Sequence, residues 1–124
     1  MDSAAAVLSS INERMKKMKI QSLTQLAPFS GDRMAKEIVF KKNNCKAVVF
    51  NFSPGQSLPL HDHPFTQTFA LVASGEGLCY TEDENFPIKE GDLIQCGPAE
   101  KIGFENNSSS NLSVYVTLVY IEEN

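Results

Sequence analysis

The chain has 124 residues, of which 42% are hydrophobic, and its formal net charge at pH 7 is −4. This length predicts one domain that buries roughly two-thirds of its unfolded surface. The acidic balance disfavours nucleic acid and anionic membranes as partners, because binding to either requires clustered cations that neutralise phosphates. No apolar stretch approaches the ~20 residues that a membrane-spanning helix needs.

Residues 1–19 are predicted to form an N-terminal extension, and residues 20–124 a single domain. Ala4–Ala6 favour a helix, and apolar residues recur at helical spacing through Val7, Leu8, Ile11, Met15 and Met18. Two interpretations remain open. The extension is either a poorly ordered segment or a short helix that packs on a partner subunit.

β-Strands are predicted from residue 37 onward. The β-branched and aromatic runs 38–40 and 47–52 flank the polar segment 41–44, which predicts a hairpin. Further strands are expected at 68–73, 78–81, 93–96, 101–104 and 112–121, with turn residues between them. Regularly spaced short strands without a helical period predict an all-β sandwich or barrel. The strand 112–121 is apolar on both faces, which predicts a homodimer.

The three cysteines, Cys45, Cys79 and Cys96, are an odd number and have no C-x-x-C spacing. This pattern fits reduced thiols better than a disulfide framework. The apolar run 4–8 is too short for a secretory leader and has no basic segment before it. We therefore expect a cytoplasmic protein.

Both histidines of the chain, His61 and His63, lie two residues apart just before an apolar run. Residues i and i+2 of a strand share a face, so the two imidazoles would point the same way. Such a pair can offer two nitrogen ligands to one metal ion. The same alternation would turn Asp62 away from its neighbours.

Fixed spacings surround these histidines. Gly55 is followed by five residues, His61-Asp62-His63, four residues, Thr68, six residues and Gly75. This segment resembles the first motif of the cupins, whose fold is the double-stranded β-helix or jelly-roll barrel. The segment from Gly91 to Asn106 is similar to their second motif in its length. The resemblance covers about residues 36–121 and implies an all-β cupin barrel preceded by a short extension.

Cupins hold a metal through three histidines and one glutamate, and the resemblance maps this set onto His61, His63, Thr68 and Ile102. Only the two histidines remain as ligands. Imidazole donors suit Fe, Mn, Ni, Cu or Zn. Gln67 is the nearest candidate for a third ligand, and the thiol of Cys96 is a second. The site holds one such divalent metal or none.

Two classes of function follow from this reduced site. The first is a small-molecule-binding cupin whose ligand pocket contains His61, His63, Gln67, Tyr80 and Ile102. The alternative is a metal-dependent enzyme of dioxygenase, isomerase or lyase type, with the metal on His61, His63 and Gln67. In either case the phenol of Tyr80 is expected to bind the ligand or to donate a proton.

Overall fold

The computed structural model describes residues 18–26 and 28–121. Within these residues the chain is all β, apart from one short 3-10 turn, so the predicted fold class is confirmed. The elements are η1 Leu23–Gln25, β1 Ala35–Lys42, β2 Cys45–Phe52, β3 Ser57–His61, β4 Thr66–Ser74, β5 Glu76–Tyr80, β6 Asn85–Lys89, β7 Leu93–Cys96, β8 Ile102–Glu105 and β9 Leu112–Tyr120.

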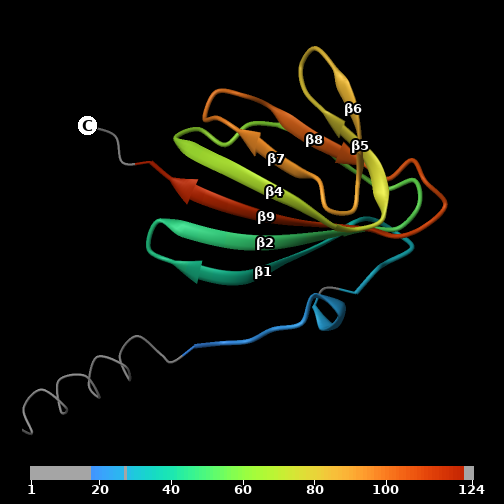
Figure 1. The fold of residues 1–124 in the computed structure, drawn as a ribbon, viewed down its shortest axis with the longest axis horizontal. Coiled ribbons are helices and arrows are strands. Elements are labelled where there is room, and N and C mark those ends of the chain that lie inside the picture. Colours follow the sequence, from blue (N-terminus) through green and yellow to red (C-terminus); the bar gives the residue numbers. More distant parts are fainter. Residues whose placement is uncertain (1–17, 27, 122–124) are drawn as a thin grey trace, which may run out of the picture.

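The strands form two antiparallel sheets that face each other. One sheet has the order β1-β2-β9-β4-β7 and the other the order β3-β8-β5-β6. Figure 1 shows β1, β2, β9 and β4 side by side in one layer, with β5, β6 and β8 on one side of it. The predicted hairpin is β1–β2, in which Lys42 pairs with Cys45. This arrangement is the jelly-roll barrel that the resemblance implied.

The main core lies between the sheets, and period-two alternation along the long strands builds it. From β9 the side chains of Leu112, Val114, Val116 and Leu118 all point inward and are buried. The intervening Tyr115 packs on the opposite face, with Val49 and Leu26. The apolar residues on both faces of β9 thus serve two packing clusters, one between the sheets and one beneath the segment that precedes β1.

Several element boundaries differ from the prediction. β4 begins at Thr66 rather than at residue 68, and residues 85–89 form strand β6, where the sequence predicted only a connection. β6 has one buried side chain in five residues, so it lacks the apolar alternation that identifies a strand. The predicted extension lies outside the described residues except for Met18 and Lys19, which have no regular secondary structure.

The remaining motif residues hold the barrel together. Asn106 is fully buried, and its Nδ2 donates to the backbone oxygens of Phe52 at 2.9 Å and Ser110 at 2.7 Å. The backbone carbonyl of Asn106 accepts a hydrogen bond from the Gly55 backbone N–H at 2.8 Å. Gly75 has a φ of +85°, and a Cβ there would lie 2.1 Å from the Asn111 carbonyl oxygen. These residues therefore position the strand that leads to the histidines.

Candidate functional site

The two histidine rings meet at the end of β3. His61 is the last residue of β3 and pairs with Ile102 of β8, whereas His63 lies beyond the strand. The expectation that one strand presents both rings is therefore wrong for His63. The rings nevertheless converge, with Nε2 atoms 3.0 Å apart and ring centroids 4.7 Å apart at 77°. The loop between β3 and β4 thus achieves what the strand alternation was expected to do.

The hydrogen bonds of this pair assign its proton positions. His61 Nδ1 lies 2.8 Å from the Pro59 carbonyl oxygen, which can only accept, so Nδ1 carries a proton. In the neutral ring His61 Nε2 then accepts a hydrogen bond from His63 Nε2. The pKa of His63 is lowered, first by burial and then by the positive fields of His61, Lys46 and Lys36. The neutral form of His63 is therefore favoured.

A cavity of about 170 Å³ lies between the sheets beside the histidines. Thr68 and Ile102 line it together with both rings, so the positions that align with the family's four metal ligands share one space. Its walls are mainly apolar, with Val48, Phe50, Leu58, Phe104, Val116 and Leu118. Lys36 and Lys46 also line it, and neither was expected from the sequence pattern. Alternation back from Val48 along β2 could have identified Lys46 as inward-facing.

Gln67 and Tyr80 do not line this cavity. Gln67 follows Thr66 and precedes Thr68, which are both buried, so alternation turns it to the other face of β4. Its buried Oε1 has no hydrogen-bond partner in the described part of the chain. The hydroxyl of Tyr80 donates to the carboxylate of Glu105 instead. The structure therefore does not bring these two candidate site residues to the histidines.

The thiol of Cys96 points toward a different cavity. Its Sγ donates to the backbone oxygens of Glu100 at 3.4 Å and Gly97 at 3.7 Å, and burial raises its pKa. Both features favour the neutral thiol over the thiolate that binds metals. Cys96 lines a cavity of about 740 Å³, together with Cys79. Ile102 lines both cavities and lies between them.

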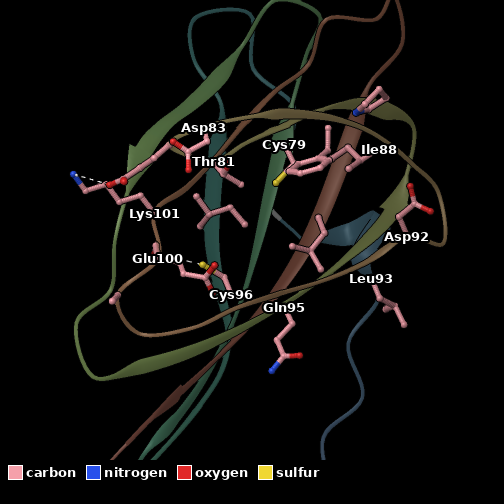
Figure 2. A pocket seen from close by; sticks show the side chains of 16 residues that line it. Cys79, Thr81, Asp83, Ile88, Asp92, Leu93, Gln95, Cys96, Glu100 and Lys101 are labelled. Atoms are coloured by element: carbon pink, nitrogen blue, oxygen red, sulfur yellow. Dashed lines mark hydrogen bonds and ion pairs between the residues drawn. The ribbon is translucent and has the colours of Figure 1, made fainter.

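The larger cavity was not predicted, and its rim is acidic. Figure 2 shows Cys79 and Ile88 on its inner side, with Asp83, Asp92 and Glu100 around it. The one lysine that lines it, Lys101, forms an ion pair with Glu82 at 3.5 Å. The two cavities therefore differ in charge: carboxylates surround the larger one, whereas lysines and histidines line the smaller one.

The donors around the histidines do not make a complete metal site. The two Nε2 atoms converge on one space and could both serve as nitrogen ligands if neither carried a proton. However, among the described residues no group of three or more histidine, cysteine, aspartate or glutamate side chains could hold a metal ion. Thr68 and Ile102 occupy the remaining positions. The residues present therefore supply half of a ligand set.

Comparison with known proteins identifies the family. The family model of the cupin domain matches residues 48–119, which is more than half of the chain. The chain belongs to the cupin family. No curated protein matches this cupin significantly. No helix in the described part of the chain has the length and apolarity needed to cross a membrane.

Solved structures share the barrel. An RmlC-like cupin from Desulfovibrio desulfuricans is 28% identical, with a TM-score of 0.74 over 82% of this chain and 96% of that one. A double-stranded β-helix protein from Klebsiella pneumoniae is 22% identical, with a TM-score of 0.79 over 87% and 95%. A predicted oxalate decarboxylase from Thermotoga maritima is 22% identical, with a TM-score of 0.68 over 71% and 81%. The last two likenesses concern the fold alone.

Proposed function

We propose that this cupin binds a small organic molecule in the cavity beside His61 and His63, without a tightly held metal. The observation that carries the proposal is the set of side chains that line this cavity. Ile102 and Thr68 stand where a cupin metal site has its third histidine and its glutamate. An apolar wall with a few convergent polar groups is typical of a small-molecule site. The proposed function is binding alone, without chemical conversion of the ligand.

Metal content and ligand binding test this proposal together. The protein is purified without added metal, its bound metal is measured by elemental analysis, and a small-molecule library is screened by thermal shift. We expect less than stoichiometric metal, together with ligands that shift the amide NMR signals of residues around the cavity. A failure of every library member to bind beside the histidines would contradict the proposal. The His61→Ala/His63→Ala variant provides the matched loss-of-site control.

A metal-dependent enzyme remains the second candidate, and the convergence of two imidazoles at one cavity favours it. A metal bound there would act as a Lewis acid on a coordinated substrate. This chain would contribute the two imidazoles, with His61 oriented by the Pro59 carbonyl. Stoichiometric metal in the wild-type protein, lost in the double histidine variant, would favour this candidate over the first.

We also propose that the protein is a cytoplasmic homodimer. All three cysteines are free thiols, which suits a reducing compartment. On the outer face of the five-stranded sheet, Phe69 and Leu71 of β4 and Leu93 of β7 remain 44%, 37% and 79% exposed. An apolar patch of this kind supports contact between two copies. Light scattering tests the assembly.

A further inference from the structure

Lys36 and Lys46 place two positive charges at the small cavity. Lys36 lies on β1 opposite Phe50, and Lys46 lies on β2 opposite Leu118. Phe50 and Leu118 are core residues that line the same cavity, so the cross-strand register brings both lysines to it. Lys36 is exposed and Lys46 half-buried, which places the charges toward the mouth rather than at the apolar base.

Neither lysine forms an ion pair with a carboxylate of the described residues. Among the described residues, the ion pairs are Lys89 with Asp92 and Lys101 with Glu82, both elsewhere in the barrel. Neither aspartate nor glutamate lines the cavity. Two ammonium groups at one cavity repel each other. They do so in a protein whose net charge is −4, in which carboxylates outnumber cationic side chains. The uncompensated charge therefore favours an anionic ligand.

A hydroxyl donor faces the same space. Thr68 is 5% exposed and lines the cavity, and its Oγ1 makes no hydrogen bond within the described part of the chain. A hydroxyl at the cavity with no partner among the described residues can donate to an oxygen of a bound ligand. The cavity thus offers hydrogen-bond donors from the lysines and Thr68, whereas its walls are apolar.

We propose that the cavity beside His61 and His63 binds a small organic carboxylate, with the carboxylate near Lys36 and Lys46 and an apolar body between the sheets. The inference rests on the proposed function and specifies its ligand class. A cavity of about 150 Å³ admits a benzene-sized molecule, and this one measures about 170 Å³. The apolar walls favour a carboxylate that carries a short hydrocarbon body over a bare inorganic oxyanion.

Calorimetric titration with matched probes tests the charge requirement. Benzoate and 3-methylbutanoate are the anionic probes, benzamide and 3-methylbutanamide are their neutral counterparts, and inorganic phosphate is the bare oxyanion. We expect at least one carboxylate to bind about tenfold or more tightly than its amide. Equal binding of amide and carboxylate would overturn the carboxylate inference and leave the proposed function standing. If inorganic phosphate bound as tightly as the carboxylates, the role assigned to the apolar body of the ligand would be overturned.

Substitution of the lysines tests which residues supply the charge. Lys36→Met/Lys46→Met removes both charges and keeps unbranched side chains that are one heavy atom shorter. Lys41→Met/Lys42→Met, on the same hairpin but outside the cavity, is the matched control. We expect the first pair to weaken carboxylate binding about tenfold or more and the control pair to leave it unchanged. Unchanged affinity in a folded Lys36→Met/Lys46→Met variant would overturn the inference.

Salt dependence of the wild-type protein supplies a test that needs no variant. Raising the ionic strength from about 0.01 M to about 1 M shortens the Debye length from roughly 30 Å to roughly 3 Å. Binding of the carboxylate should weaken markedly over this range, whereas binding of the amide should not. Carboxylate affinity that ignores salt would also overturn the inference. If neither carboxylates, amides nor any library compound bind, the proposed function itself has failed.

Discussion

His61 and Ile102 are cross-strand partners in β3 and β8, so an isoleucine lies beside the imidazole where a cupin metal site has another histidine. Thr68 lines the same cavity from β4. The four positions that the cupin resemblance assigns to metal ligands therefore surround one cavity, and two of them carry side chains that do not bind metal. The two histidines therefore supply half of a ligand set within the cupin barrel.

Restoring the missing ligands should restore metal binding. In Thr68→Glu/Ile102→His we expect one Zn²⁺ or Mn²⁺ per chain after dialysis, measured by elemental analysis. Metal at about 100 times its Kd should stabilise this variant by about 2.7 kcal/mol, and a chelator should reverse the gain. Adding His61→Ala to the variant should abolish both effects. A folded double variant that binds no more metal than the wild type would contradict the geometry described for the cavity.

Gly75 should tolerate a side chain far less well than Gly55. Both have positive φ, but a Cβ at Gly75 would lie 2.1 Å from the Asn111 carbonyl oxygen, whereas Gly55 has nothing within 4 Å. Gly55→Ala should cost about 1–2 kcal/mol from its backbone conformation alone. Gly75→Ala should cost about 4 kcal/mol or more, because the backbone must also move. Urea unfolding of both variants measures the difference, and equal costs would contradict the close contact.

The thiol of Cys79 should lower stability at alkaline pH. Burial, with a smaller contribution from Cys96, raises the pKa of Cys79 to about 11, from an ordinary value near 9.0. The unfolded chain therefore loses this proton at lower pH than the folded chain does. The stabilisation is fully present below about pH 9 and is lost as pH rises toward 11. The free energy of unfolding of the wild type, relative to that of Cys79→Ala, should fall over this window. A constant difference would refute the prediction.

Thiol alkylation should follow burial. Cys79 and Cys96 are buried, whereas Cys45 is partly exposed at the start of β2. We expect iodoacetamide at pH 8 to modify Cys45 first, as read by peptide mass spectrometry. The other two should react only when the protein unfolds, because each needs both exposure and ionisation. Fast modification of Cys79 in the folded protein would show that the larger cavity gives access to it.

The apolar outer face of the five-stranded sheet should hold the proposed dimer together. Leu71 and Leu93 are cross-strand partners and both remain exposed. Leu93→Glu should convert the dimer to a monomer in light scattering, because a carboxylate would be buried against the partner without a counter-charge. Phe86→Glu, at a residue of similar exposure to Phe69 but in the other sheet, should leave the assembly unchanged. A monomeric wild-type protein would contradict the proposed dimer.

The sequence alone predicts the class of fold and most strands, because these depend on local patterns. The apolar runs 47–52 and 112–121 belong to strands that pack on both faces, and the confirmed hairpin needs only its own turn. The spacing from Gly55 to Gly75 identifies the barrel for a similar reason: its glycines meet backbone requirements that few other residues can satisfy.

The composition of the site depends on the tertiary structure. Strand alternation places Gln67 on the opposite face of β4 from Thr68, and Tyr80 donates to Glu105, outside the small cavity. The two histidines converge although only His61 lies in a strand. Lys36 and Lys46 reach the cavity because β2 pairs with β1 on one side and with the distant β9 on the other. Pairing between residues far apart in the chain decides which side chains share a cavity, and local sequence does not contain that information.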